Sequence, residues 1–178
     1  MTIGLETPRL RLREWTIADL PPLKRFLQDE QVMTAYAHAF SDEEVRHWLD
    51  WTLRLYRERG YGLWAIERKA DGEVVGECGL TDQTVDGVVY LEIGYHLIRA
   101  YWHHGYAGEA ARTCKLYAFE HLKRATVVSI VRDTSLASMN VAIRHGMTVR
   151  KRFVKHYWGQ DMPHYLFAAD SDKITYQQ

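Results

Sequence analysis

The loop at residues 102–110 combines residue types that can bind an anion. Gly105, Ala107 and Gly108 have little or no side chain, and a helical pattern starts directly after Gly105. Successive N–H groups of such a loop can point at one anion, and the helix dipole adds a favourable potential. Small residues at a helix start also allow close packing, and taken alone the pattern favours that explanation. The loop has neither the Gly-Lys-Ser/Thr of a P-loop nor the Gly-x-Gly-x-x-Gly of a dinucleotide site.

The segments around this loop alternate between strand-like and helix-like patterns. Ser41 and Glu44 form a capping box before one helix, and Gly60 ends it. Asp-Gly pairs between apolar, alternating runs are typical of hairpin turns. The patterns predict helices at residues 16–27, 42–59, 106–122 and 137–145, and strands at 10–13, 61–67, 73–80, 88–97, 126–131, 147–154 and 164–168.

One crossover sets the predicted fold class. The β-branched run at residues 126–131 follows a strand and a helix, which implies one parallel strand pair with a right-handed crossover. The other connections are short and favour antiparallel pairs. The sequence therefore predicts an α+β fold with a mixed, mostly antiparallel sheet of six or seven strands and flanking helices.

Length and composition restrict the possible classes of protein. The chain has 178 residues, 47% of them hydrophobic and 26% charged, which fits a globular protein. It contains no linker-like stretch and no repeat, so we expect a single domain over residues 1–178. The 23 Lys and Arg residues equal the 23 Asp and Glu residues, so no net charge favours nucleic acid or a membrane surface as a partner.

Targeting and cysteine patterns point to the cytoplasm. The longest run without Asp, Glu, Lys or Arg is residues 31–41, well short of the roughly 20 apolar residues that cross a bilayer. The N-terminus has no apolar segment typical of a signal peptide. Cys78 and Cys114 are too few for a disulfide framework, and we expect both to be reduced and buried.

The nine histidines do not form a metal-binding pattern. No His-x-x-x-His or Cys partner occurs at ligand spacing, so no metal is predicted. We interpret the tryptophans at positions 15, 48, 51 and 64, with Tyr56, as packing residues rather than a ligand cage.

Four pieces of the chain, taken in order, resemble one family. Residues 102–107 resemble the acetyl-CoA-binding segment of the GNAT acetyltransferase superfamily, whose pyrophosphate loop reads Gln/Arg-x-x-Gly-x-Gly/Ala. Trp102 replaces the Gln/Arg, as is common in the ribosomal-protein N-terminal acetyltransferase branch, while His103 and Gly108 replace a Gly and a Thr of that branch. The branch is also similar at residues 6–13, 92–95 and 137–147.

The resemblance implies how acetyl-CoA would bind. It implies a sheet in which a bulged strand splays from its parallel neighbour and opens a slot for the pantetheine arm. Backbone groups of Tyr95 and Leu97 would pair with the pantetheine amides. The family often has an Asn where this chain has Ser135, and Asn140 is the expected substitute. The pyrophosphate would lie on His103, His104, Gly105, Tyr106, Ala107 and Gly108.

The resemblance also implies direct attack of an amine on the thioester, for which a base and an acid are needed. Glu92 is the candidate base because it faces away from Leu91 and Ile93, although a solvated strand glutamate is the alternative. Glu77 and His96 are the next candidates. Many family members have, at the position of Ala142, a Tyr that acts as the general acid. Ser138, one turn earlier, is therefore the candidate acid, and an ordinary helix serine is the alternative.

These inferences favour a cytoplasmic N-acetyltransferase that uses acetyl-CoA and no metal. The acceptor is a primary amine, either a protein N-terminus or a small molecule, and a homodimer stays open. A non-catalytic acyl-CoA sensor or interaction module is the alternative. The basic stretch at residues 123–155 is interpreted as a solvated edge that could attract the CoA 3′-phosphate or an acidic partner. An RNA-binding module built on it is disfavoured because the aromatic platform of such modules is missing.

Overall fold

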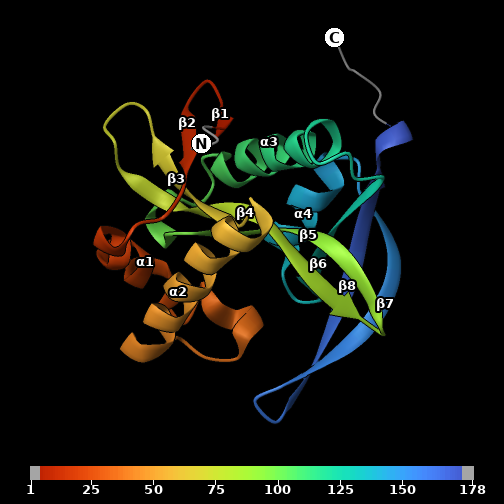
Figure 1. Ribbon diagram of the computed structural model, residues 1–178. Coiled ribbons are helices and arrows are strands. Elements are labelled where there is room, and N and C mark those ends of the chain that lie inside the picture. The colour runs from red at the N-terminus through yellow and green to blue at the C-terminus, as the bar shows by residue number, and fades with distance from the viewer. Residues whose placement is uncertain (1–4, 174–178) are drawn as a thin grey trace.

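A computed structural model describes residues 5–173 as one continuous sheet with helices on both faces (Figure 1). The strand order is β1-β2-β3-β4-β5-β6-β8-β7, and within the described residues only the β5–β6 pair is parallel. The strands are β1 (Leu5–Glu6), β2 (Leu10–Arg13), β3 (Leu63–Arg68), β4 (Val74–Val85), β5 (Val88–Leu97), β6 (Thr126–Arg132), β7 (Thr148–Tyr157) and β8 (Gln160–Asp170).

Four α-helices and four short 3-10 turns complete the described part of the chain. The α-helices are α1 (Leu20–Leu27), α2 (Asp42–Arg59), α3 (Tyr106–Glu120) and α4 (Leu136–Arg144). The 3-10 turns are η1 (Ile17–Asp19), η2 (Met33–Tyr36), η3 (Arg99–Tyr101) and η4 (Ser171–Lys173). The α+β fold class and the parallel crossover are confirmed.

Local sequence signals explain where several elements begin and end. The Ser41 hydroxyl accepts from the Glu44 amide at 3.2 Å, and the Glu44 carboxylate accepts from the Ser41 amide at 2.8 Å, as the capping box predicts. Gly60 ends α2 with a φ of 74°. Asp86 and Gly87 both have positive φ, which lets a two-residue turn join β4 to β5.

Some boundaries differ from the prediction. The helix predicted at 16–27 is divided into η1 and α1, and Thr16 and Asp19 cap the first turn. The described sheet has eight strands rather than six or seven, because the two-residue strand β1 adds an edge. The final hairpin is longer than expected and turns at Trp158 and Gly159, since Pro163 lies beyond the end of the β6–β8 ladder and does not interrupt it.

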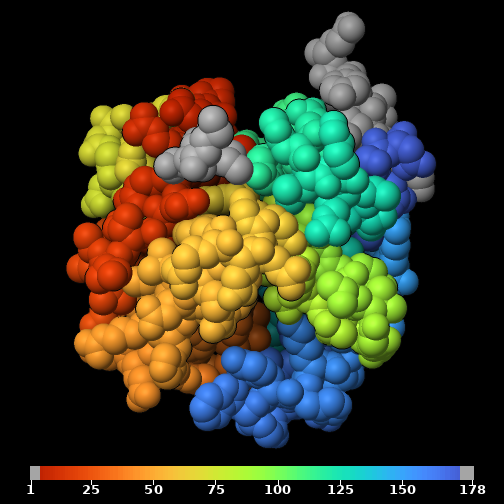
Figure 2. Space-filling view, viewed as in Figure 1, coloured from red at the N-terminus to blue at the C-terminus, as the bar shows by residue number. Residues whose placement is uncertain are grey.

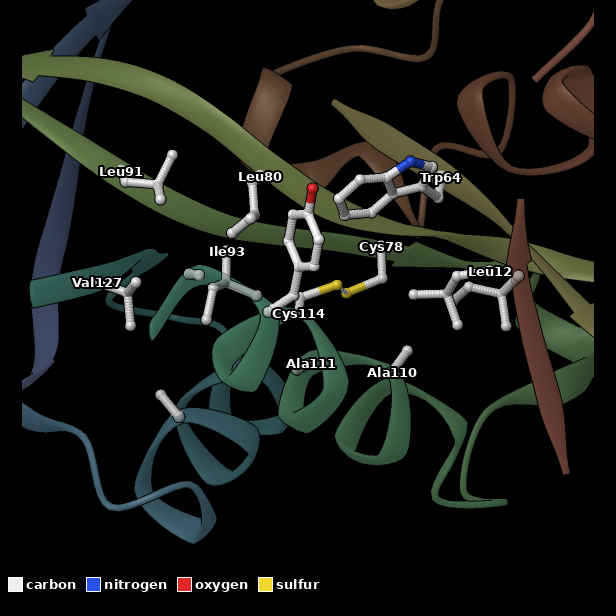
Figure 3. Packing of buried hydrophobic residues seen from close by; sticks show 14 of the residues in the cluster. Leu12, Trp64, Cys78, Leu80, Leu91, Ile93, Ala110, Ala111, Cys114 and Val127 are labelled. Carbon is white, nitrogen blue, oxygen red and sulfur yellow. Dashed lines mark hydrogen bonds between the residues drawn. The ribbon is translucent and has the colours of Figure 1, made fainter. Parts of the chain in front are cut away.

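Two apolar layers hold the helices on the sheet. On one face, the small side chains of Ala110, Ala111 and Cys114 let α3 lie close to β4 and β5 (Figure 3). Cys78 and Cys114 are free and buried as predicted, with their sulfur atoms 3.6 Å apart. On the other face, α1 and α2 cover a second apolar cluster that includes Phe26, Leu49 and Ala65.

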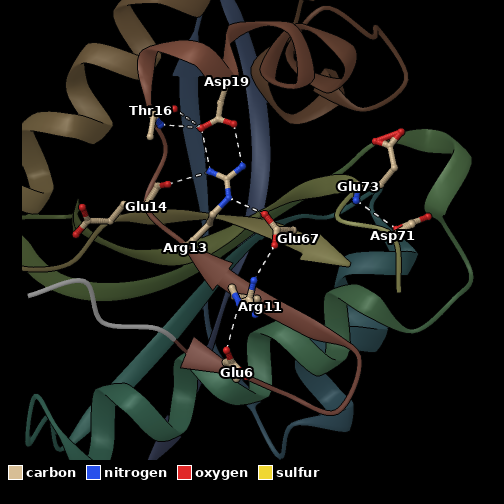
Figure 4. A network of polar contacts seen from close by, with 9 residues as sticks. All are labelled: Glu6, Arg11, Arg13, Glu14, Thr16, Asp19, Glu67, Asp71 and Glu73. Carbon is tan, nitrogen blue, oxygen red and sulfur yellow. Dashed lines mark hydrogen bonds and ion pairs between the residues drawn. The ribbon is translucent and has the colours of Figure 1, made fainter. Parts of the chain in front are cut away.

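A polar network fixes the N-terminal strand against this frame (Figure 4). Arg13 donates two hydrogen bonds to Asp19 and a third to Glu67, while Arg11 bridges Glu67 and Glu6. Although burial opposes it, hydrogen bonds from Arg13 and Thr16 hold the pKa of Asp19 below its usual value. Arg11 and Arg13, which belong to the family-like segment 6–13, therefore have a structural role here.

Within residues 5–173, none of the helices combines the length and the apolar character needed to cross a bilayer.

Candidate active site

Within the described residues, the β5 and β6 strands are paired in a ladder at one point and not beyond it. Their parallel ladder consists of the single pair Glu92 and Val128. The β4–β5 ladder, in contrast, runs from Gly76 and Leu97 to Val85 and Val88 without a register shift. The bulge that the resemblance implied is therefore absent from the β4–β5 ladder, and the separation lies entirely on the β6 side of β5.

The register determines which backbone groups border this gap. The Ile98 amide donates to the carbonyl of Val75 at 2.9 Å, one step beyond the Gly76–Leu97 pair that begins the β4–β5 ladder. Hydrogen-bonded pairs alternate along an antiparallel ladder, so Gly94 and His96 face β4 while Tyr95 and Leu97 face β6.

Side chains partly fill the gap. Ser129 donates from its hydroxyl to the Ile93 carbonyl at 3.1 Å, and the Trp102 indole donates to the Leu97 carbonyl at 3.0 Å. The Tyr95 backbone amide and carbonyl have no ladder partner on this side among the described residues. An open strand edge at Tyr95 is what an amide-bearing ligand needs in order to pair with the sheet.

The loop before α3 presents free amides at one end of this gap. His103 and Gly105 have φ of 64° and 79°, which reverse the chain before the helix. In the described residues, none of the amides from residue 103 to 108 donates a hydrogen bond to the protein. His103, His104 and Gly105 are exposed, Tyr106 is buried in the core, and Ala107 and Gly108 are half-buried. Free N–H groups at a helix start form an anion-binding site.

A buried histidine lies beside the same loop. The imidazole Nε2 of His145 is enclosed and interacts with the backbone of Gly108. It would lie 3.7 Å from a Cβ placed at Gly108. Burial, with the positive charges of Lys115 and Arg112, lowers the pKa of His145 to about 4. His145 is therefore neutral at physiological pH and can donate or accept a hydrogen bond.

The N-terminal segment holds the loop in place. The carboxylate of Glu109, in the first turn of α3, accepts hydrogen bonds from the Thr7 hydroxyl and from the Arg9 amide and side chain. Arg9 also donates to the His104 carbonyl at 3.0 Å and stacks over the Tyr106 ring. Despite burial, these donors hold the pKa of Glu109 below its usual value. Segment 6–13 and the loop, which the resemblance picked out separately, form one unit.

A cavity of about 300 Å³ opens on the face of the sheet covered by α2. In Figure 2, the surface is indented where α2, the β4–β5 hairpin and the β7–β8 hairpin meet. The cavity is lined by charged, aromatic and hydroxyl side chains, among them Tyr36, Trp48, Trp51, Glu92, His96, Arg132, Ser138, Lys155 and Tyr157. It therefore offers both proton-transfer groups and aromatic walls.

Glu92 lies in this cavity, as its alternation with Leu91 and Ile93 predicted. Leu91 and Ile93 are buried against the α3 face, whereas the Glu92 carboxylate accepts from the Ile130 amide at 3.3 Å on the opposite face. Burial raises the pKa of Glu92, and the charge of Lys155 and the Ile130 hydrogen bond only partly offset this. A carboxyl with a raised pKa is suited to accept protons near neutral pH.

Ser138 and Asn140 have different surroundings. Ser138 lines the cavity, and its hydroxyl accepts from that of Ser135 at 2.9 Å. Its backbone carbonyl accepts from the Tyr95 hydroxyl at 2.9 Å, which ties α4 to β5. Asn140 is exposed on α4 and lines neither the cavity nor the gap. The structure thus brings Ser138 into the cavity with Glu92 and leaves Asn140 outside it.

Sequence reasoning missed part of the cavity wall. Trp15 and Trp64 are core residues, but Trp48 and Trp51, interpreted as packing residues, line the cavity. Lys155, assigned with its basic stretch to a solvated edge, lines it too. Phe153, Lys155 and Tyr157 alternate along one strand and therefore share a face, which could have placed Lys155 beside aromatic side chains rather than at a solvated edge.

The comparisons with known proteins agree with this geometry. The sequence profile of the acetyltransferase (GNAT) domain matches residues 9–148. The chain belongs to the GNAT acetyltransferase family. Acetyl transfer from acetyl-CoA is the activity that this membership supports, with the acceptor undetermined.

Individual relatives cover most of this GNAT chain. The uncharacterised Bacillus subtilis protein YkkB is 37% identical over 154 residues, which cover 83% of this chain and 88% of YkkB. A GNAT-family acetyltransferase from Bacillus anthracis has a TM-score of 0.81 at 20% identity, covering 97% of this chain and all of that one. The ribosomal L7/L12 alpha-N-protein acetyltransferase RimL, in complex with coenzyme A, has a TM-score of 0.74 at 18% identity. The match covers 96% of this chain and 98% of RimL. At these identities the two structures show a shared fold.

No group of three or more His, Cys, Asp or Glu side chains in residues 5–173 of this GNAT chain is arranged to hold a metal ion.

The raised pKa of Glu92 predicts a pH-dependent stability. A carboxyl with a raised folded-state pKa contributes stability that is complete below its unfolded pKa and is lost as pH rises through the folded value. Glu92→Gln cannot ionise and avoids that loss. We expect the melting temperature of Glu92→Gln, relative to wild type, to be higher at pH 8 than at pH 4.5. Glu120→Gln, on the exposed side of α3, is the control and should show no such trend. A constant difference for Glu92→Gln would contradict the burial argument.

Proposed function

We propose that this chain acts as one acetyltransferase domain that transfers the acetyl group of acetyl-CoA to a primary amine. The observation that carries the proposal is the open β5 edge at Tyr95, which continues into the free amides of residues 103–108. The edge suits the amide-bearing pantetheine arm, and the loop suits the pyrophosphate. RimL, which shares the fold, is a neighbour whose structure contains coenzyme A.

Binding would use mainly the backbone. Tyr95 and Leu97 would pair with the pantetheine, and His103, His104, Gly105, Tyr106, Ala107 and Gly108 would surround the pyrophosphate. The Leu97 carbonyl already accepts from Trp102, so Tyr95 would contribute more of the pairing. The contact expected for Asn140 stays a prediction.

Two side chains would perform the proton transfers. As the acceptor nitrogen forms its bond to the thioester carbon, Glu92 takes a proton from that nitrogen. As the carbon–sulfur bond breaks, the Ser138 hydroxyl donates a hydrogen bond to the departing sulfur, or a proton that it then regains from solvent. The hydrogen bond that Ser138 accepts from Ser135 leaves its own O–H free for this role.

The acceptor is a protein N-terminus or a small-molecule amine. Two observations support a protein N-terminus. The motifs that resemble the ribosomal-protein N-terminal acetyltransferase branch occur in the same order along this chain, and RimL is among the structural neighbours. Acceptor loops vary within one fold, so other amines compete with it. The cytoplasmic location and a homodimer stay predictions.

A screen for thiol release tests the proposed reaction. Acetyl-CoA is incubated with the protein and with peptides that have free N-termini, polyamines, amino acids or amine antibiotics, and free thiol is measured. Turnover with at least one amine is expected. Acetyl-CoA binding without turnover on any amine would instead identify the non-catalytic sensor.

Gly105→Glu tests the loop. It would place a carboxylate where the pyrophosphate is expected, at a position whose φ of 79° suits glycine. We expect acetyl-CoA binding, measured by calorimetry, to weaken by at least about a hundredfold because like charges meet in the cradle. Gly72→Glu is the matched control, since it has a φ of 75° in the β3–β4 turn and no atom within 4 Å of an added Cβ. Unchanged affinity in folded Gly105→Glu would remove the loop from the binding site.

Glu92→Gln tests the base. The variant keeps the shape of the side chain and removes the proton acceptor, so kcat/KM should fall by about a hundredfold or more. Acetyl-CoA affinity should be nearly unchanged, which calorimetry checks. Wild-type rates between about pH 6 and pH 9 would assign Glu92 to structure.

Ser138→Ala tests the acid. We expect kcat to fall by about tenfold near pH 7, and by less near pH 9, because a thiol with a pKa of about 8.5 leaves readily as thiolate at higher pH. The ratio of kcat for wild type and variant at both pH values is the measurement. Equal rates at both would exclude Ser138 from the mechanism.

A further inference from the structure

A second titratable pair, of which His96 lines the cavity and Glu77 lies behind it, has no role in the proposed mechanism. Glu77 on β4 and His96 on β5 are directly opposite in the β4–β5 ladder, and the imidazole Nδ1 lies 2.9 Å from the Glu77 carboxylate. The Glu77 side chain is fully buried, whereas that of His96 keeps 13% of its exposure. The carboxylate also accepts from the Trp48 indole at 3.2 and 3.4 Å.

This arrangement sets the tautomer of His96. The Trp48 indole can only donate, and Glu77 as a carboxylate can only accept, so the imidazole proton lies on Nδ1. In the neutral imidazole, Nε2 then has a free lone pair. Nε2 has no hydrogen-bond partner among the described residues and is not enclosed by protein. Because His96 lines the cavity, this lone pair is available to a molecule bound there.

Aromatic neighbours hold the ring in one orientation. The imidazole is stacked on Phe26, with ring centroids 6.1 Å apart and planes 15° from parallel. Trp48 and Tyr36 contact it with centroids at 6.0 and 5.5 Å. A ring restrained on several sides keeps Nε2 directed at a fixed point, which proton transfer requires.

The position of His96 relative to Glu92 leaves room for a substrate. Glu92, Gly94 and His96 alternate on one strand, so they share the cavity face of β5. Gly94 has no side chain, and the nearest atom to a Cβ added there would be Leu63 Cδ2 at 3.8 Å. An amine above Gly94 would therefore lie between the Glu92 carboxylate and the His96 imidazole.

We propose that His96, oriented by Glu77, is a second catalytic base that converts the acceptor from ammonium to amine. The inference rests on the proposed acetyl transfer. Most primary amines are protonated at neutral pH, and an ammonium nitrogen has no lone pair with which to attack. The Nε2 lone pair forms a new N–H bond as the N–H bond of the ammonium breaks, and that electron pair stays on the amine nitrogen.

The remaining protons are accounted for by the groups already described. The neutral amine attacks the thioester carbon, Glu92 takes the second proton from nitrogen, and the sulfur leaves with the electron pair of the broken C–S bond. The resulting imidazolium is stabilised by the Glu77 carboxylate and returns its proton to solvent after the product leaves. Glu77 is the positioning residue, and His96 is the group that touches the substrate.

Other charged and titratable groups face His96 from several elements. Glu92 on β5 and Lys155 on β7 line the cavity with His96, and Glu77 on β4 contacts its Nδ1. Tyr36 on η2 and Tyr157 on β7 line the same cavity, and burial raises the pKa of Tyr36 so that it stays neutral.

Kinetics of His96→Gln test the proposal with an amine that the wild type acetylates. We expect kcat/KM to fall by at least about a hundredfold near pH 7, with acetyl-CoA affinity unchanged. The defect should shrink toward pH 9.5, where more of the amine is already neutral. The Glu92→Gln defect should persist there, because the attacking nitrogen still has a proton to lose. His121→Gln, an exposed histidine after α3, is the control and should keep wild-type rates.

Glu77→Gln separates positioning from general structural damage. A Gln amide can donate to Nδ1 and move the imidazole proton to Nε2, which blocks proton acceptance. We expect a loss similar to that of His96→Gln, and no further loss in the double variant. Full additivity of the two single losses would contradict a shared role.

Nitrogen-15 NMR of the wild-type histidines gives a readout that does not depend on activity. His96 should show a protonated Nδ1 and an unprotonated Nε2 at pH 7.5, and Glu77→Gln should reverse this. The opposite wild-type tautomer would overturn the inference even if no acceptor is found. Turnover in wild type with wild-type rates in His96→Gln from pH 6 to pH 9.5 would overturn it while leaving the acetyl transfer intact.

Discussion

The single ladder pair between β5 and β6, Glu92 with Val128, is the constraint on which the rest of the site depends. One side of β5 stays hydrogen-bonded to β4 over its whole length, so the strand is rigid where it leaves β6. Separation at that point frees the backbone of Tyr95 on one edge. It also places Glu92 at the vertex, where burial raises the pKa of its carboxyl. One topological feature thus produces both the binding edge and a group suited to proton transfer.

The loop before α3 is positioned by the core rather than by its own sequence. Ala110, Ala111 and Cys114 let α3 approach β4 and β5, which sets the direction of the helix N-terminus. Thr7 and Arg9 then bind Glu109, one turn into the helix, so the N-terminal segment and the loop move together. Exposed free amides carry an entropic cost when a ligand orders them, and this anchoring reduces that cost.

Much of the fold was predictable because local signals agreed with tertiary structure. The Ser41 capping box, the Asp86-Gly87 turn and the β-branched run of β6 each have a local physical cause. The same is true of the side of β5 on which Glu92 lies, since strand alternation fixes it. The strand count was less predictable because β1 is two residues long and exists only through its pairing with β2.

The cavity wall was harder to predict because it joins distant segments. Trp48 on α2 and Lys155 on β7 have ordinary sequence surroundings, and only the chain topology brings them to the same space as His96. The hydrogen bond from Trp48 to Glu77 could not be inferred from spacing, because the two residues lie on different elements. Ala142, where many family members have a Tyr, is 2% exposed and packs in the apolar cluster beneath α3.

Amide hydrogen exchange, measured residue by residue with and without acetyl-CoA, tests the central claim most directly. If the ligand pairs with the open edge of β5, the amide of Tyr95 and those of residues 103–108 will exchange more slowly in its presence. The amides of Gly94 and His96, which face β4, are internal controls and should be unchanged. Protection at Gly94 and His96 without protection at Tyr95, or no protection in the loop, would contradict the account.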